Sequence, residues 1–390
     1  MTMTRLCAAL LASAVLTTAV PAGAADLKIG FLATLSGSIG AMGQDQYDGF
    51  MLGLEQMGGK LGGKTIEVVK EDDQFKPDVG VQVAQKLISE DKVPIITGVS
   101  YSNVMMAINK KITDAGVFLI GSASGPSPMA GAACSPLFFS TSWQNDQMSE
   151  AVGKYATEKG YKKIFAMGPN FQGWKDALAG FRRYYKEPFV KELHTPLNQM
   201  DLSAEMAQIA LAKPDAVFAH YAGGLGVNFI KQYRQAGLLG KIPLIVVATV
   251  DGLTLPALNE TALGVMTAQV WAPDTDNAAN KAFVEAFEKK YGRIPSNFAA
   301  QAYDSAKLLD VAIGQVKGDL SNKEAFAAAL KNAKFESVRG KFAFNNNNFP
   351  IENFNLLEVG KDAKGRVSMV TKGVLLVDQK DAYHQECPMK

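Results

Sequence analysis

The stretch DLKIGFLATLSGSIGAMGQDQYDGFMLGLEQMGG, residues 26–59, joins a short apolar segment to an amphipathic one through a glycine-rich turn. Apolar residues dominate 26–34, which predicts a strand. Within 45–57 the apolar side chains recur at helical spacing, which predicts a helix that ends at the two glycines 58–59. A strand, a turn over 36–43 and a helix in this order form the repeating unit of an α/β fold.

The same alternation continues along the chain. Further strands are predicted at 64–70, 93–98, 117–122, 163–168, 190–194, 216–220, 243–248, 264–271, 342–344, 353–359 and 373–377. Further helices are predicted at 78–90, 103–115, 146–159, 174–185, 203–212, 227–236, 277–291, 298–315 and 323–332. Short apolar strands alternating with helices predict parallel sheets covered on both faces. Because the alternation restarts after Ser140, we expect two doubly wound lobes.

Length and composition exclude several classes of protein. The chain has 390 residues, which exceeds the usual single domain of about 100–200 residues. It is 47% hydrophobic and 20% charged, so a disordered chain is excluded. A formal net charge of +2 gives no electrostatic reason to expect nucleic acid as a partner. With three histidines and three cysteines, no structural metal site is expected.

The first 24 residues are predicted to be a cleaved signal peptide. Arg5 supplies a positive start, and the apolar run 6–20 is shorter than the roughly 20 residues that cross a bilayer. Pro21 breaks this run, and 22–24 is a small-residue cleavage site. A membrane anchor is the alternative. No later apolar run is long enough to span a membrane, so we expect a soluble periplasmic protein.

Export changes the interpretation of the cysteines. Cys7 lies inside the signal peptide, which leaves Cys134 and Cys387 in the mature chain. An even number of cysteines in an oxidising compartment predicts a disulfide between them. Two unpaired buried thiols are the alternative.

One motif resembles a nucleotide site and is rejected. Gly58-x-x-x-x-Gly63-Lys64-Thr65 matches the P-loop pattern. That loop needs a strand before it and a helix after it, so that the helix N-terminus faces phosphate. Here a helix precedes and a strand follows, so the segment is interpreted as a helix end and a hairpin. We expect no bound ATP.

No arrangement of residues predicts catalysis. The three histidines are scattered, and neither G-x-S-x-G nor H-E-x-x-H occurs. The serine-rich run 122–127 has no evident partner base. Gly37, Gly40 and Gly43 follow the first strand, where they could form a backbone cradle for an anion or only a tight turn. We therefore expect a binding protein without a cofactor rather than an enzyme.

Several segments, taken in order, resemble one family. They are Lys28-Ile-Gly-Phe31, Leu35-Ser-Gly37, Ile96-Thr-Gly-Val-Ser-Tyr-Ser102, Ile120-Gly-Ser-Ala-Ser-Gly125, Pro169-Asn-Phe-Gln-Gly173 and Ala302-Tyr-Asp-Ser-Ala306. Together they resemble the periplasmic solute-binding proteins of ABC transporters, of the branched-chain amino acid type. The resemblance covers nearly all of the mature chain.

The resemblance implies a type I periplasmic binding fold, with two lobes joined by three crossovers. The first lobe would hold 26–141 and 272–349, and the second 142–271 and 350–390. The ligand would lie in the cleft between them, at the carboxyl ends of the strands. A monomer that delivers its ligand to an inner-membrane permease is expected. A ligand sensor of the same fold is the alternative.

The resemblance also implies where a ligand carboxylate binds. The matching positions in the first lobe are Ser102, Ala123, Ser124 and Gly125. Serine hydroxyls and backbone N–H groups there would satisfy a desolvated carboxylate, each bond contributing roughly 1.5–3 kcal/mol. The alternative for the two serines is N-capping of the helices that follow them.

The remaining site positions depart from amino-acid binders of the family. Met42 stands where those proteins carry a tyrosine, and small residues occupy 222–224. A broad apolar slot is predicted from Met42, Phe171, Tyr221, Trp271 and Phe298, although each aromatic side chain could instead belong to the core. Such a slot favours a flat aromatic acid, of the hydroxybenzoate or phenylpropenoate type. A branched-chain amino acid is the second candidate, and an amide or urea the third.

The acidic position of the family is matched by Asp251. With an amino-acid ligand it would bind the ammonium group. With an aromatic acid it would accept from a ring hydroxyl or serve a local turn with Gly252.

Overall fold

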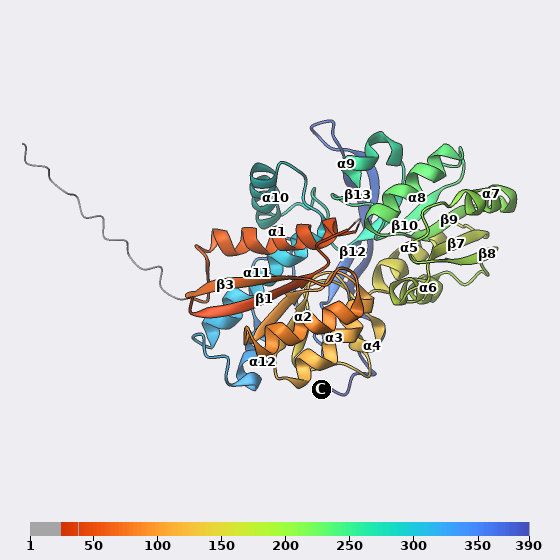
Figure 1. Cartoon of the computed structure of the whole chain (residues 1–390). Helices are drawn as coiled ribbons and strands as arrows, with labels where there is room; N and C mark the ends of the chain where they lie inside the picture. Colours follow the sequence, from red (N-terminus) through yellow and green to blue (C-terminus); the bar gives the residue numbers. More distant parts are fainter. Residues whose placement is uncertain (1–24, 38, 390) are drawn as a thin grey trace, which may run out of the picture.

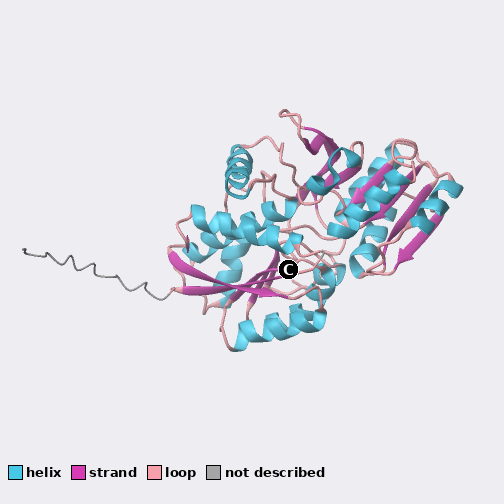
Figure 2. Cartoon of the chain, turned by 45° about the horizontal axis from the view of Figure 1, so that its top comes forward, coloured by secondary structure: helices cyan, strands magenta, loops and turns pink. Residues whose placement is uncertain are grey.

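Two sheets, each flanked by helices, form two lobes in the computed structural model, which describes residues 25–37 and 39–389 (Figures 1 and 2). The predicted fold class is therefore confirmed. The predicted signal peptide, residues 1–24, lies outside the described residues. Among the helices that are described, none is both long and apolar enough to cross a bilayer.

The first sheet is built by the N-terminal part of the chain. Its strands, in spatial order, are β2 (Lys60–Leu61), β3 (Lys64–Asp72), β1 (Leu27–Ala33), β4 (Ile95–Gly98), β5 (Phe118–Gly121) and β6 (Phe138–Ser140). All neighbours are parallel except β2 and β3, which form an antiparallel hairpin. The hairpin follows directly on the end of the first helix, so the P-loop-like motif is a helix end and a hairpin, as predicted.

The helices of this lobe lie on both faces of the sheet. They are α1 (Ala41–Gln56), α2 (Pro77–Ser89), α3 (Ser102–Asp114), α4 (Ser127–Ala130), α11 (Asn297–Gln315) and α12 (Lys323–Asn332). Helices α1 and α11 pack closely because Gly49 has no side chain, and a Cβ there would lie 2.1 Å from the carbonyl oxygen of Ala299. Residues far apart in sequence thus complete one lobe.

The second sheet takes its strands from the middle and the end of the chain. In spatial order they are β13 (Val367–Gln379), β12 (Glu352–Lys361), β11 (Met266–Gln269), β10 (Leu244–Val247), β9 (Ala216–His220), β7 (Ile164–Pro169) and β8 (Lys191–Thr195). The helices before and between its strands are α5 (Gln147–Glu158), α6 (Gln172–Tyr184), α7 (Ser203–Ala212), α8 (Gly223–Gln235) and α9 (Leu255–Leu258), with the 3₁₀ turn Asn259–Ala262. Helix α10 (Ala278–Tyr291) follows β11 and precedes α11 along the chain.

Three details of the predicted strands are wrong. The sheet is not entirely parallel, because β12 runs antiparallel to both β11 and β13. Residues 342–344 form no strand, and Phe344 makes only an isolated bridge to Pro350. The last strand is β13, residues 367–379, longer than predicted at 373–377. It lies at the edge of the sheet, where exposed polar residues interrupt the apolar run that the prediction relied on.

The chain passes between the two lobes three times. It leaves the first sheet after β6, returns after β11, and crosses again between α12 and β12. The number of crossovers agrees with the expected fold, and the residue boundaries of the two lobes stay a prediction.

The C-terminal tail lies against the first lobe. Cys134 and Cys387 form a disulfide with their Cα atoms 5.7 Å apart, so this prediction is confirmed. Asn347, in the last crossover, donates to Asp381 at 2.9 Å and to the carbonyl oxygen of Ala130 at 2.8 Å. The tail therefore returns from β13 to the loop after α4, although the predicted division places it in the second lobe.

Candidate ligand site

A cavity lies between the two lobes, where strands of both sheets end. Its lining comes from the segments at and after the ends of β4, β5 and β6 of the first sheet and of β7, β9 and β10 of the second, and from helices α1, α5 and α11. The lining residues are Met42, Ser100, Tyr101, Ser102, Ala123, Ser124, Trp143, Asn145, Met148, Phe171, Gly173, His220, Ala222, Val247, Ala248 and Phe298. In open α/β sheets the carboxyl ends of the strands are the usual place for a ligand.

Three helices begin at this cavity. The N-cap residues of α3, α6 and α8 are Tyr101, Phe171 and Ala222, and none of them caps its helix with a side-chain hydrogen bond. All three line the cavity. The first N–H groups of a helix have no partner inside it, and the helix dipole adds partial positive charge there. The cavity therefore offers an anion three helix N-termini.

The two predicted serines both line the cavity, and neither caps a helix. Ser102 is the first residue of α3, and its Oγ accepts a hydrogen bond from Asn145 Nδ2 at 3.0 Å. Ser124 precedes the N-cap residue Pro126 of α4, and its Oγ is buried without a hydrogen-bond partner among the described residues. The alternative reading of these serines as caps is therefore not supported.

Aromatic side chains form the walls of the cavity. Phe298 and Trp143 pack with ring centroids 5.9 Å apart, and both rings are almost completely buried. Phe171 meets the His220 ring edge-on, at a centroid distance of 5.4 Å. Met42, at the start of α1, is also buried in the lining. Of the five residues predicted to form a slot, Met42, Phe171 and Phe298 thus line this cavity.

The histidine of the lining is neutral at physiological pH. Burial lowers the pKa of His220 from its ordinary value of 6.5 to about 4. Its Nδ1 is buried and has no hydrogen-bond partner among the described residues. It therefore supplies a polar ring and no positive charge.

Two predicted residues lie close to the cavity without lining it. The Tyr221 hydroxyl shares a hydrogen bond with Thr195 Oγ1 at 3.2 Å, and its ring stacks on Phe229 in the core of the second lobe. Successive side chains at the end of β9 point in opposite directions, so His220 faces the cavity and Tyr221 does not. Gly125 donates its N–H to Asn145 Oδ1 at 2.9 Å, so that group is already used.

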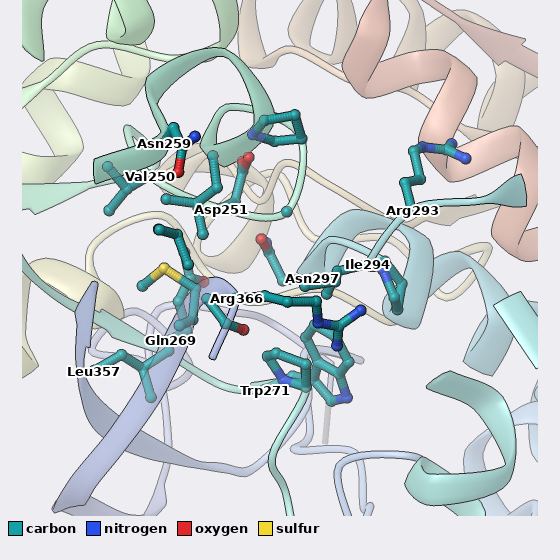
Figure 3. Close-up of a pocket in the computed structure, with 18 of the residues that line it drawn as sticks. Val250, Asp251, Asn259, Gln269, Trp271, Arg293, Ile294, Asn297, Leu357 and Arg366 are labelled. Carbon is teal, nitrogen blue, oxygen red and sulfur yellow. The ribbon is translucent and has the colours of Figure 1, made fainter. Parts of the chain in front are cut away.

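The other two predicted residues lie in a neighbouring cavity (Figure 3). Asp251 and Trp271 line it together with Gln269, Asn297 and Arg366. It occupies the junction between the second sheet and the loop before α11. The structure thus separates Asp251 and Trp271 from the cavity that holds the serines.

Asp251 and Trp271 make hydrogen bonds to nearby residues in the neighbouring cavity. Asp251 Oδ1 accepts from the N–H groups of Leu253 and Thr254, at 2.9 and 3.0 Å. Burial raises the pKa of Asp251, and these hydrogen bonds oppose the rise. The Trp271 indole donates to Asn280 at 2.6 Å. Asp251 therefore serves a local turn, which is one of the roles predicted for it.

Several lining residues were not predicted. Trp143 and Asn145 lie in the irregular crossover after β6, where no periodic pattern marks a residue. Tyr101 stands directly before Ser102, and its hydroxyl donates to the carbonyl oxygen of Ile39 at 3.2 Å. His220 stands directly before Tyr221. The alternation of side chains at the end of a strand was the available signal for His220.

Two lobes with a lined cavity between them are the architecture of a two-lobed solute receptor. The chain belongs to the periplasmic binding protein family, whose model matches residues 26–365. Membership of this family implies an extracytoplasmic location.

The chain is also similar to individual proteins of known name or structure. It is 28% identical to the Leu/Ile/Val-binding protein homolog 6 of Brucella melitensis biotype 1, covering 92% of this chain and 94% of the relative. It is 32% identical to a solute-binding protein of an ABC transporter from R. palustris, solved in complex with benzoate, with a TM-score of 0.88 and coverage of 93% of this chain and 99% of the other. It is 30% identical to a solute-binding protein of an ABC transporter from Rhodopseudomonas palustris BisB5, solved in complex with 3,4-dihydroxybenzoic acid. The TM-score is 0.86, and the match covers 91% of this chain and 98% of the other.

Proposed function

We propose that this protein is the extracytoplasmic solute receptor of an ABC importer, and that it binds a small aromatic carboxylate in the cavity between its lobes. One observation carries the ligand class. None of the described residues that line the cavity is an aspartate, glutamate, lysine or arginine, and three helix N-termini without side-chain caps meet there. Such a site suits an anion that carries no ammonium group.

The donors for the carboxylate lie on the first lobe. Ser102 and Ser124 both line the cavity, and α3 begins at Ser102 without a side-chain cap. A buried carboxylate is stable only when several donors replace its water, and hydrogen bonds to a charged group contribute roughly 1.5–3 kcal/mol each. Two or three such bonds are available without any countercharge.

The walls suit a flat ring. Phe171, Trp143 and Phe298 are aromatic, and Met42 and Ala123 fill the space between them with apolar surface. Burying about 130 Å² of ring surface contributes roughly 3 kcal/mol. The hydrogen bonds to the carboxylate add several kcal/mol more before the cost of ordering the complex is subtracted, so micromolar affinity, about −8 kcal/mol, is within reach. The two solved relatives described above hold benzoate and 3,4-dihydroxybenzoic acid, which supports the same class.

A branched-chain amino acid is the second candidate, because the Brucella melitensis relative is named as a Leu/Ile/Val-binding protein. Its ammonium group would need a carboxylate once water is excluded. Asp251 is the residue that the family resemblance offers for this, and its Oδ1 is used by its own turn in a different cavity. The aromatic acid is therefore favoured.

A thermal-shift screen tests the ligand class. Benzoate, 4-hydroxybenzoate and a phenylpropenoate would be compared with leucine, valine, acetamide and urea. A ligand at 100 times its Kd adds about 2.7 kcal/mol to the free energy of unfolding, so the expected result is a clear rise in Tm with the aromatic acids only. A rise with leucine or valine and none with the aromatic acids would contradict the proposal.

An uptake measurement separates the importer from a sensor. Cells that lack this gene should take up labelled benzoate more slowly, and the gene in trans should restore the rate. Unchanged uptake in the deletion strain, with benzoate bound by the purified protein, would identify a sensor instead.

A further inference from the structure

Asn145 connects the two lobes at the edge of the ligand cavity. It lies in the crossover between β6 and α5 and lines the cavity. Its Oδ1 accepts from the Gly125 N–H at 2.9 Å, and its Nδ2 donates to Ser102 Oγ at 3.0 Å and to Asp176 Oδ2 at 2.9 Å. Its backbone N–H also donates to the Gly125 carbonyl oxygen at 2.9 Å. Every polar atom of this side chain is therefore used.

The chemistry of the three partners permits only one orientation of the Asn145 amide. The Gly125 N–H can only donate, so the atom facing it must be the oxygen. The Asp176 carboxylate accepts hydrogen bonds from Ser127 Oγ and Gln172 Nε2 as well, so the Asn145 atom facing it must be the nitrogen. A flipped amide would place two donors together at Gly125 and two acceptors together at Asp176. The assignment of oxygen and nitrogen thus follows from the partners.

This orientation decides what the Ser102 hydroxyl can do. Ser102 Oγ accepts one hydrogen of Asn145 Nδ2, so the serine proton cannot point back at Asn145. Ser102 has no other side-chain hydrogen bond to a described residue, and it is buried in the lining of the cavity. The proton is left to donate into the cavity, where the proposed function places a carboxylate.

Asp176 belongs to the other lobe, on α6. Besides Asn145 it accepts from Ser127 Oγ of α4 at 2.8 Å and from Gln172 Nε2 at 2.7 Å. Asp176 is buried, with 2% of its surface exposed. Because Ser127 and Ser102 lie in the first lobe and Asp176 in the second, this network is complete only when the lobes are together.

We propose that Asn145 is a positioning residue that orients the Ser102 hydroxyl proton toward the ligand carboxylate. Because Asn145 also donates to Asp176 in the second lobe, this orientation is fixed when the two lobes are closed. The inference rests on the proposed function, since it requires a carboxylate in this cavity. It adds a specificity-determining residue that does not need to touch the ligand.

An exchange of the two side chains tests this role. In the double variant Asn145→Asp with Asp176→Asn, the new amide at 176 donates to the new carboxylate at 145, so the bond between the lobes is kept. The Gly125 N–H also keeps its acceptor. At Ser102, however, an acceptor replaces a donor, and the hydroxyl turns toward residue 145. We expect the ligand-free Tm to stay close to that of the wild type and the benzoate Kd, measured by calorimetry, to rise at least tenfold.

The same exchange in a Ser102→Ala background separates the reorientation of the hydroxyl from the effect of moving the negative charge from position 176 to position 145. There the same exchange should raise the benzoate Kd by a factor at least threefold smaller than it does when Ser102 is present, because no hydroxyl remains to be turned and only the moved charge acts. An equal loss with and without Ser102 would assign the effect to the moved charge and overturn the inference. Wild-type affinity in the exchange variant would overturn it as well, since Asn145 would then only link the lobes.

The result stays distinct from the test of ligand class. If the wild type binds leucine and not benzoate, the proposed ligand class fails, and leucine, which also carries a carboxylate, becomes the probe for the same cycle. A wild-type protein that binds neither benzoate nor leucine overturns the positioning role together with the proposed function.

Discussion

The two cavities differ in how their polar groups are satisfied. The neighbouring cavity is the larger and is lined by Asp251, Arg293 and Arg366. Arg293 pairs with Asp45 and Asp48, Arg366 pairs with Asp362 and Glu288, and Asp251 is held by its own turn. Its fully buried side-chain atoms without a hydrogen-bond partner among the described residues belong to two neutral carboxamides, Gln269 Oε1 and Asn297 Nδ2.

The cavity between the lobes has the opposite character. Its described lining includes no charged side chain at neutral pH. The Ser124 hydroxyl has no hydrogen-bond partner among the described residues, and three helices begin there without a side-chain cap. If the ligand site were chosen by size and nearby charge, the neighbouring cavity would be preferred. If it is chosen by available hydrogen-bond donors, the cavity between the lobes is preferred. Because an anion is held by hydrogen-bond donors, the second criterion supports the cavity between the lobes as the proposed ligand site.

The largest expected effect comes from placing a carboxylate in each cavity. Ala123→Asp puts a negative charge beside the proposed ligand carboxylate, where water is excluded, and should weaken benzoate binding more than 100-fold. Asn259→Asp, in the lining of the neighbouring cavity, is the matched control and should change the benzoate Kd less than threefold. Calorimetry measures both. Equal losses in the two variants would remove the distinction between the cavities.

Removing one donor sharpens the comparison. Ser102→Ala should weaken benzoate binding by roughly 1–3 kcal/mol, about 5–150-fold in Kd, because a hydrogen bond to a buried charge is lost. The ligand-free Tm should change little, since the Ser102 side chain bonds only to Asn145 among the described residues. Unchanged affinity would mean that this hydroxyl does not face the ligand carboxylate.

The pH dependence of stability depends on His220 in the cavity between the lobes. Burial lowers the pKa of His220 in the folded protein to about 4. Between pH 6.5 and about 4, His220 is therefore protonated in the unfolded chain and neutral in the folded one. Stability from this group is therefore complete above pH 6.5 and lost as the pH falls, at up to about 1.4 kcal/mol per pH unit. The contribution of His220 is measured by comparing the free energy of unfolding of the wild type and of His220→Gln, from denaturant unfolding at pH 7 to pH 4. Parallel curves would show that the ring titrates normally.

The smallest effect is expected at Asp251. Asp251→Asn keeps the Oδ1 that accepts from Leu253 and Thr254 and removes the charge. For an aromatic acid the Kd should change less than threefold, since no ammonium group is present. A loss of more than tenfold, together with tight binding of leucine by the wild type, would move the ligand site toward the neighbouring cavity.

Most of the fold could be predicted from the sequence because it depends on local periodicity. The helix at 203–212 agrees with α7 at both ends, and the strand at 216–220 agrees with β9. The antiparallel pairing of β12 with β11 depends on residues about 90 positions apart, and no local pattern reports such a contact.

The candidate site could be predicted where its residues follow strands directly. Ser102, Ala123 and Ser124 come just after β4 and β5, and all three line the cavity. The prediction of Tyr221 as a lining residue is wrong by one position. Successive side chains of a strand point to opposite sides, and His220 is the one that faces the cavity. Asn145 was missed because its importance comes from three partners brought together by the crossover, none of them near it in sequence.

The disulfide between Cys134 and Cys387 has a consequence for the life of the protein outside the cytoplasm. It closes a covalent ring whose two cysteines are 253 residues apart, and every strand of the second sheet lies inside that ring. A protease that cuts one peptide bond within the ring opens it without releasing a fragment, and the two lobes stay joined. A nicked receptor would thus run as a single band on a gel without reductant and separate into two pieces only after the disulfide is reduced.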